Sequence, residues 1–264
     1  MKHIKSYKIF ESAEPNFPTT REGVIQVCKR YEIKNYTIND DLSIDVDGDV
    51  NLKGEGLEYL PLKFNYVSGY FGCSYNDLVS LKGSPQTVSG DFYCNSSGLK
   101  TLEGCPQTVG GDFNCYSNEL KSLEGSPQTV GGNLKCQFNE LKTLKGSPQT
   151  VNGDFNCFNN KLESLEGSPQ TVNGNFLCYI NELKDLEYFP EVSGIINIQF
   201  NLVNLLVSTF IKKADSFMIE DFVDYEIVRN RDTVMLDRLQ TFIKDNNLEM
   251  TDLEKIKKHY KIIE

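Results

Sequence analysis

The sequence predicts an α/β repeat protein: a solenoid of about eight stacked coils, with a parallel β-sheet on its concave face and a helical cap at each end. Three observations predict this fold class. Valine recurs every 21 residues, at Val46, Val67, Val88, Val109, Val130, Val151 and Val172. A hexapeptide, GSPQTV or its variant GCPQTV, ends at five of these valines. A strand-like stretch that reads F-x-C-x-x-N-x-L follows them, so several columns repeat in register at once.

Each coil is predicted to contribute one strand whose side chains alternate between the core and the outside. Phe113 and Cys115 share one face of such a strand and Asn114 takes the other, because successive strand side chains point to opposite sides. The same inward pair recurs at Phe92/Cys94, Leu134/Cys136, Phe155/Cys157 and Phe176/Cys178. Leucine pairs such as Leu120 and Leu123 follow each strand. These constant columns predict the hydrophobic core.

Asparagine, glycine and proline mark the bends of each coil. The asparagine column comprises Asn76, Asn118, Asn139, Asn160, Asn181 and Asn201, with Ser97 as the exception. A buried asparagine here can bond backbone groups that the bend leaves free. A glycine before each strand, such as Gly132, predicts a tight turn. A proline such as Pro127 stiffens each return segment, which is too short for a helix.

The two ends of the stack need caps, because each exposes an apolar surface. We expect an N-terminal segment and helical cap over residues 1–43, the solenoid over 44–206 and an α-helical domain over 207–264. In the first of these, Thr19 and Glu22 form a capping box before an amphipathic helix.

The C-terminal domain is predicted to contain several helices. Apolar periodicity favours helices over 205–213, 217–228 and 233–245. A second capping box, Thr251 and Glu254, opens another helix that ends the chain. We expect this domain to pack on the last coil.

Composition limits the classes of partner and the cellular locations that can be expected. The net charge is −10, which repels phosphate backbones, so we expect no nucleic acid and favour a basic or weakly charged protein partner. No apolar run approaches the roughly 20 residues of a membrane helix, so no membrane contact is expected. The N-terminus lacks the apolar segment of a secretory signal. We therefore expect a cytoplasmic protein whose eight cysteines are mostly free thiols.

The strongest candidates for metal binding or redox chemistry are the cysteines that recur in one column: Cys73, Cys94, Cys115, Cys136, Cys157 and Cys178. It could bind metal or relay electrons, or it could be a buried apolar column. Leu52 and Ile198 occupy the same column in the terminal coils, which favours a small hydrophobic residue over a ligand. Side chains in parallel register also rarely meet the geometry of a disulfide. We therefore predict a structural role and no metal.

Other signs of catalysis or cofactor binding are weak. Asp45, Asp47 and Asp49 resemble the start of a calcium loop, but the position that should hold its closing glutamate is Gly56. No nucleophile with its base, phosphate-binding loop or zinc-protease motif can be assembled. The sequence therefore predicts neither an enzyme nor a cofactor.

The outward positions of the strands vary while the core columns stay constant, which indicates a recognition surface. Tyrosine, asparagine and aspartate dominate there, as they do in many binding surfaces, although they also simply tolerate strand surfaces. Phe158 beside Leu177 and Tyr179 is the best candidate for a hot spot. The candidate partner-binding residues are Tyr93, Tyr116, Phe158, Leu177, Tyr179, Asp91, Asp112, Asp154, Asn114 and Asn156.

The repeat resembles the short leucine-rich repeats, of about 21 residues, found in bacterial and tailed-bacteriophage proteins. Ser43–Leu52, which reads SIDVDGDVNL, and Leu123–Cys136, which reads LEGSPQTVGGNLKC against LEGSPQTVGGDFNC in the phage type, carry the likeness together with the opening residues 5–12. The resemblance implies a horseshoe-shaped or gently curved solenoid without enzymatic activity. It also implies a protein-binding role in the cytoplasm of an infected bacterium, with a host factor as partner.

Three functions are therefore weighed. The leading hypothesis is a non-enzymatic module that binds a protein on the concave face. The alternative is a structural or assembly component of a virus particle that oligomerises through its caps or edges. The third is an enzyme or metal protein, which metal analysis of the reduced chain would reveal. Neither the partner, nor the oligomeric state, nor a role of the C-terminal domain beyond capping follows from the sequence.

Overall fold

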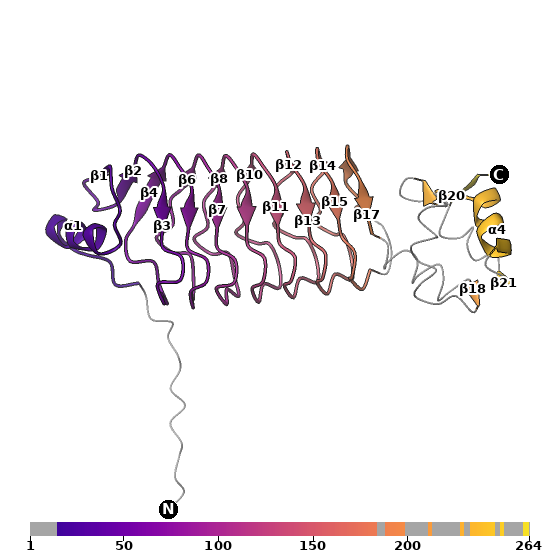
Figure 1. The fold of residues 1–264 in the computed structure, drawn as a ribbon, viewed down its shortest axis with the longest axis horizontal. Coiled ribbons are helices and arrows are strands. Elements are labelled where there is room, and N and C mark those ends of the chain that lie inside the picture. The colour runs from indigo at the N-terminus through magenta and orange to yellow at the C-terminus, as the bar shows by residue number, and fades with distance from the viewer. Residues whose placement is uncertain are drawn as a thin grey trace, which may run out of the picture.

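A computed structural model shows a β-solenoid of stacked coils (Figure 1). It describes residues 15–183, 188–198, 211–212, 228–229, 233–245, 249–250 and 261–263. The coils make about seven turns and lie side by side along an almost straight axis in Figure 1. Each turn adds one strand to each of two parallel sheets.

The strand predicted from the F-x-C column is present and forms an eight-stranded sheet. Its members are β3 (Val50–Asn51), β5 (Phe71–Gly72), β7 (Phe92–Tyr93), β9 (Phe113–Asn114), β11 (Leu134–Lys135), β13 (Phe155–Asn156), β15 (Phe176–Leu177) and β17 (Ile196–Asn197). Every neighbouring pair is parallel and in the register of the repeat, so that Leu134 lies between Phe113 and Phe155. The 21-residue period therefore fixes both the pairing and the register.

A second sheet of nine strands runs along the other side of each coil and was not predicted. It comprises β1 (Tyr36–Ile38), β2 (Ile44–Val46), β4 (Phe64–Val67), β6 (Thr87–Val88), β8 (Thr108–Val109), β10 (Thr129–Val130), β12 (Thr150–Val151), β14 (Thr171–Val172) and β16 (Glu191–Val192). Most of these strands are the last two residues of the hexapeptide. Val130 pairs with Val109 and Val151, and only β1 runs antiparallel to its neighbour. The valine column thus belongs to a strand, and its side chains are buried.

The core lies between the two sheets and consists of the predicted columns. Phe113 and Cys115 are completely buried, as are the leucines Leu120 and Leu123. The phenylalanines of neighbouring coils stack, with ring centroids 5.4 Å apart for Phe71–Phe92 and 5.9 Å for Phe92–Phe113. Because every coil buries the same side chains, each coil stabilises its neighbours, and no coil has a complete core by itself. The predicted inward columns of the strand are confirmed.

The asparagine column bonds backbone groups of two coils, as predicted. The side-chain oxygen of Asn118 accepts from the backbone N–H groups of Ser97 and Leu99, at 2.9 and 3.1 Å. Its amide nitrogen donates to the carbonyls of Cys94 and Cys115, both at 3.0 Å. Asn139 and Asn160 repeat both donations, and each accepts one backbone N–H, from Leu120 and Leu141. The predicted member Asn201 lies outside the described residues.

The glycine column before the strand has a different cause from the one predicted. A Cβ atom on Gly132 would lie 2.4 Å from the Asp112 Oδ1 atom and 2.8 Å from the carbonyl carbon of Gly111. Close approach of successive coils therefore excludes a side chain here. Left-handed backbone occurs elsewhere: at the glycine that begins each hexapeptide, and at the residue before Ser97 and before each described asparagine of the column. The latter residues are Tyr75, Ser96, Ser117, Phe138, Asn159 and Ile180.

The N-terminal helical cap is present as α1 (Arg21–Arg30), which buries Val24 and Cys28 against the core. Its N-cap is Thr20, not the Thr19 of the predicted capping box. The Thr20 side chain accepts a hydrogen bond from the Gly23 backbone at 3.1 Å. Thr20 has the extended backbone conformation that an N-cap needs.

The C-terminal region contains strands as well as a helix. The helix predicted over 233–245 is present as α4 (Leu236–Asp245), which buries Leu239 and Phe242. Short strands accompany it: β18 (Ile211–Lys212), β19 (Val228–Arg229), β20 (Thr233–Met235), β21 (Glu249–Met250) and β22 (Lys261–Ile263). β18 and β22 fall where helices were expected, so the wholly α-helical expectation is not met. The rest of the predicted helices lies mostly outside the described residues.

Candidate functional site

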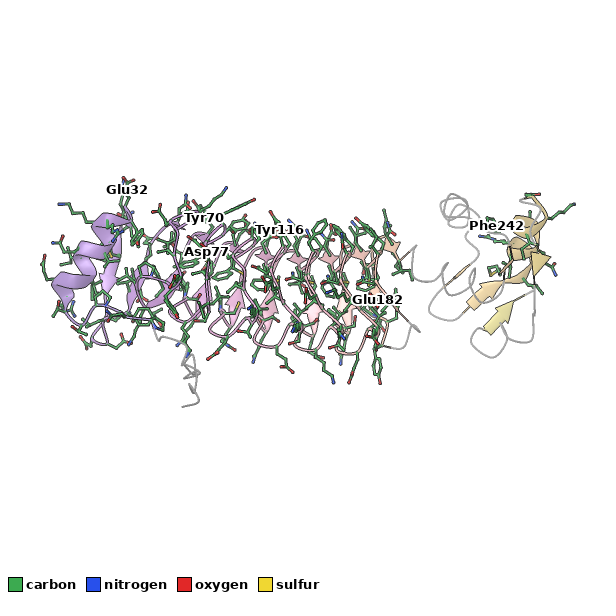
Figure 2. The ribbon with its side chains drawn as sticks, turned by 90° about the horizontal axis from the view of Figure 1, so that it is seen from below. Glu32, Tyr70, Asp77, Tyr116, Glu182 and Phe242 are labelled. Carbon is green, nitrogen blue, oxygen red and sulfur yellow. The ribbon has the colours of Figure 1, made fainter. Side chains whose placement is uncertain are left out.

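The outward side of the eight-stranded sheet, which we call the outer face, carries all the predicted site residues. Because Phe113 and Cys115 point inward, Asn114 and Tyr116 lie on this face. Figure 2 shows Tyr70 and Tyr116 on the same side of the solenoid. The structure divides the predicted residues into an aromatic cluster toward the last coils, a tyrosine-lined hollow toward the first, and a row of carboxylates and amides beside them.

The aromatic cluster combines predicted and unpredicted residues. Phe158 and Tyr179 stack with ring centroids 4.5 Å apart and an interplanar angle of 5°, and Phe138 meets Phe158 edge-on at 5.3 Å. Phe138 and Ile180 are 47% and 46% exposed and were missed. The same column holds serine or asparagine in three other coils, which indicates a position that tolerates exposure but does not show that an apolar residue there is exposed. We call Phe138, Phe158, Leu177, Tyr179 and Ile180 the aromatic patch.

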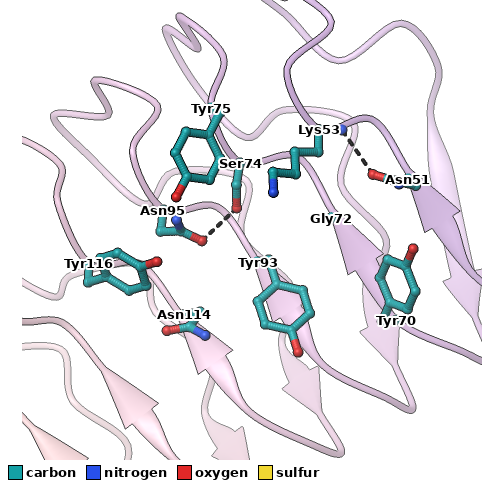
Figure 3. Close-up of a pocket in the computed structure, with 10 residues that line it drawn as sticks. All are labelled: Asn51, Lys53, Tyr70, Gly72, Ser74, Tyr75, Tyr93, Asn95, Asn114 and Tyr116. Atoms are coloured by element: carbon teal, nitrogen blue, oxygen red, sulfur yellow. Dashed lines mark hydrogen bonds between the residues drawn. The ribbon is translucent and has the colours of Figure 1, made fainter.

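The tyrosine hollow has a volume of about 330 Å³ and lies over the first coils (Figure 3). The residues that line it are Asn51, Lys53, Tyr70, Gly72, Ser74, Tyr75, Tyr93, Asn95, Asn114 and Tyr116. Of these, the sequence had predicted Tyr93, Tyr116 and Asn114 as site residues. Its other members come from several coils, and no pattern along the chain indicates that they line one space.

Two tyrosine hydroxyls of the hollow are held in place. Tyr93 donates a hydrogen bond of 2.5 Å to Asp91 Oδ2. This bond to a carboxylate, together with burial, raises the pKa of Tyr93 to about 12. Burial and a hydrogen bond to Tyr75 raise the pKa of Tyr116. Both phenols therefore stay neutral at physiological pH and present a hydroxyl that can donate and accept.

The predicted aspartates Asp91, Asp112 and Asp154 have a structural role that the sequence did not reveal. Each uses Oδ1 to accept the backbone N–H of the equivalent residue one coil later, at 2.7 to 2.8 Å. Asn133 and Asn175 do the same in their coils. The row is therefore a side-chain ladder that ties the coils together.

Asp112 also carries an ion pair. Its Oδ2 atom lies 2.9 Å from the ammonium of Lys135. Burial opposes ionisation, but hydrogen bonds from Asn133 and Lys135 outweigh it and hold the pKa of Asp112 below its ordinary value. The carboxylate is therefore occupied on both oxygens, which leaves it less available to a partner than the sequence suggested.

The predicted Asn114 and Asn156 are more buried than an outward position implies. Asn114 is only 7% exposed. The Oδ1 atoms of both residues, and Oε1 of Gln137, are buried without a hydrogen-bond partner. Buried polar atoms are nearly always paired in native proteins, so these oxygens need an explanation. They lie on the face where the variable residues gather.

The cysteine column is buried, and its six members are free thiols, as are Cys28 and Cys105. Burial raises the pKa of the Cys94 thiol well above its ordinary value and that of Cys115 to about 12. Thiolates are the nucleophiles and metal ligands of cysteine chemistry, so the column is inert at neutral pH. In the part of the chain that the structure describes, no cluster of three or more His, Cys, Asp or Glu side chains could hold a metal ion.

This burial predicts alkaline destabilisation. The folded-state pKa values are raised, so the stability that neutral thiols contribute is complete below about pH 9, the ordinary thiol value, and declines above it as unfolded thiols ionise. Each buried thiol should cost about 1 kcal/mol per pH unit above that point. Urea unfolding between pH 8 and pH 10 measures the slope. Cys94→Ala/Cys136→Ala should reduce it, and a slope identical to that of the wild type would contradict the explanation.

No helix among the described residues has the length and apolar character required to cross a bilayer. Comparison with models of protein families, with curated protein sequences and with solved structures finds no match to this chain. Support for the fold and for the candidate surfaces therefore comes from this chain's own sequence and structure.

Proposed function

We propose that this chain is a non-enzymatic recognition module of the short leucine-rich-repeat type that binds a protein partner on the outer face of the eight-stranded sheet. In a leucine-rich repeat this face is the concave one. The single observation that carries the proposal is the aromatic patch, with Phe138 and Ile180 half exposed beside the stacked rings of Phe158 and Tyr179. The host cytoplasm is the proposed location.

The patch has the properties of an interface centre. Exposed apolar side chains that lie side by side are uncommon on monomers and mark interaction sites when polar residues surround them. Here the neighbouring outer-face positions are Asn156 and Gln137. Rings that are already stacked lose little further freedom on binding, so more of the contact energy appears as affinity. The net charge of −10 favours a basic or weakly charged partner.

The test is capture from a bacterial lysate with three immobilised proteins. These are the wild type, the patch variant Phe158→Ala/Tyr179→Ala, and the control Thr129→Ala/Thr150→Ala on the exposed positions of the nine-stranded sheet. A partner of this face should be recovered about tenfold less with the patch variant, because two central aromatic residues typically contribute that much or more. The control should match the wild type. Equal recovery of every captured protein by all three would reject this face.

A structural role in a virus particle is the second proposal, and the last described coil favours it. Ile195 and Ile196 there are 69% and 44% exposed, at the end of the eight-stranded sheet. An apolar sheet end can pair with a second copy. Light scattering would show an oligomer that Ile195→Lys/Ile196→Lys dissociates, whereas a monomer at all concentrations would remove this alternative.

A further inference from the structure

We propose that the tyrosine hollow is a carbohydrate site that takes one pyranose unit or a disaccharide. This goes beyond the protein partner proposed above and does not depend on it. The hollow is separate from the aromatic patch, with which it shares no residue. Its volume of about 330 Å³ is at the small end of the range of about 300 to 1,000 Å³ for ligand sites.

The hollow exists because of Gly72. The same column of the outer face holds Tyr93, Asn114, Lys135, Asn156 and Leu177 in the following coils. Gly72 lies in strand β5, and a Cβ atom there would meet nothing closer than the Tyr70 ring, at 3.5 Å. Neither the backbone nor the packing therefore requires glycine. Its effect is to leave vacant the place that a side chain fills in the later coils.

The walls offer ring faces and hydroxyl-bonding groups together. Figure 3 shows Tyr70 and Tyr93 along one side of Gly72, with Tyr75 and Lys53 along the other. The centroids of the Tyr70 and Tyr93 rings are 6.2 Å apart. The polar groups are amides, hydroxyls and one ammonium, and no aliphatic side chain other than the stem of Lys53 lines the space. Apolar contact must therefore come from tyrosine rings.

A saccharide matches this combination. A pyranose presents a C–H face that packs on an aromatic ring and a rim of hydroxyls that donate and accept hydrogen bonds. Tyrosine supplies both an apolar body and a polar tip at such a site. Purely apolar ligands would leave the amides unpaired, which is costly. A nucleotide would also stack on the rings, but its phosphates carry several negative charges and the lining offers one cation, Lys53.

Asn114 supplies an independent indication. It lines the hollow, is 7% exposed, and its Oδ1 atom has no partner. Rotation of the amide about its Cβ–Cγ bond exchanges the places of oxygen and nitrogen, so the group that faces the hollow can be a donor or an acceptor. A sugar hydroxyl can bond either one. In contrast, Asn95 is already bonded, since its Oδ1 atom accepts from Ser74 Oγ at 2.6 Å.

Lys53 predicts which saccharides bind best. Its ammonium lies 4.8 Å from the centroid of the Tyr75 ring, at the edge of the hollow. It is the only cation among the residues that line the space. A uronic acid can place its carboxylate there, so acidic saccharides should bind more tightly than neutral ones by about fivefold, as expected for a partly exposed ion pair.

The experiment is saturation-transfer NMR on the full chain with glucose, galactose, N-acetylglucosamine, glucuronic acid and their disaccharides as probes. At least one should bind, with a Kd of about 1 mM as for a small, shallow site. Gly72→Tyr should abolish its signal by filling the hollow with the residue that Tyr93 places in the same column. Lys53→Gln should weaken the binding of glucuronic acid by about fivefold and leave the binding of the neutral sugars unchanged. Circular dichroism and the melting temperature confirm that the variants fold.

The outcomes separate the two proposals. Phe158→Ala/Tyr179→Ala should bind saccharide like the wild type, even if it loses a protein partner. Wild-type protein that gives no signal with any probe overturns the carbohydrate site, and so does a signal that Gly72→Tyr retains. If Gly72→Tyr instead prevents protein capture while no sugar binds, the hollow belongs to the protein-binding surface and the carbohydrate inference is wrong.

Discussion

Replacement of Gly146 by alanine should lower the free energy of unfolding by about 4 kcal/mol. Gly146 has a φ of +94°, which costs an L-residue about 1 to 2 kcal/mol. A Cβ atom there would also lie 2.2 Å from the carbonyl carbon of Leu123 and 2.3 Å from the backbone nitrogen of Glu124. These are backbone atoms of the preceding coil, so the clash is relieved only by separating two coils, at a further cost of about 1 to 3 kcal/mol.

Gly98 provides the matched control for this prediction. Its φ is +69°, but a Cβ atom on it would meet nothing within 4 Å. Gly98→Ala should therefore show the conformational cost alone, about 1 kcal/mol. Urea unfolding followed by circular dichroism measures both. Losses of equal size would show that the close approach of coils adds nothing.

Removal of one asparagine from the column should be about as damaging. Asn118→Ala should lower the free energy of unfolding by about 4 kcal/mol, because it deprives the N–H groups of Ser97 and Leu99 and the carbonyl of Cys94 of their side-chain partner inside the core. Each buried donor or acceptor left without a partner costs about 1 to 3 kcal/mol, and water entering the vacated space recovers part of that. Hydrogen exchange should also rise at the amides of Ser97 and Leu99.

An exposed asparagine of the same molecule serves as the control. Asn152 lies on the surface, and its side chain makes a single exposed hydrogen bond, with Asn173. Asn152→Ala should change stability by less than about 0.5 kcal/mol. If Asn118→Ala were equally mild, the column would be a surface preference and not a support of the bends.

The repeat allowed the core to be predicted residue by residue, because a fixed period reveals which positions hold nearly the same residue in every coil. Phe113, Cys115 and Asn118 follow from that contrast alone. The second sheet did not follow, because the residues around Thr129–Val130 show no alternation of apolar and polar side chains like that of Phe113 to Cys115. Pairing across coils, and not local pattern, makes it a strand. The same reason explains β22, where partners far away in the sequence decide the structure.

The candidate surfaces were predicted in part. Phe158, Leu177 and Tyr179 were predicted because they are large apolar residues at the variable, outward positions of the repeat. Phe138 and Ile180 were missed, because the left-handed backbone that exposes them cannot be inferred from apolar residues that usually avoid it. Gly72 was overlooked for a different reason. A glycine has no side chain that would indicate a binding site. Gly72 creates a hollow only because tyrosine rings from other positions surround it in space.

The shared register of the two sheets has a consequence for molecular length. Val130 lies beside Val151 and Leu134 beside Phe155, so every internal coil offers the same pair of surfaces to its neighbours. Excision or duplication of one whole unit would join surfaces that already fit. Each coil removed or added would thus change the length of the solenoid by about 4.8 Å and leave both ends of the chain unchanged.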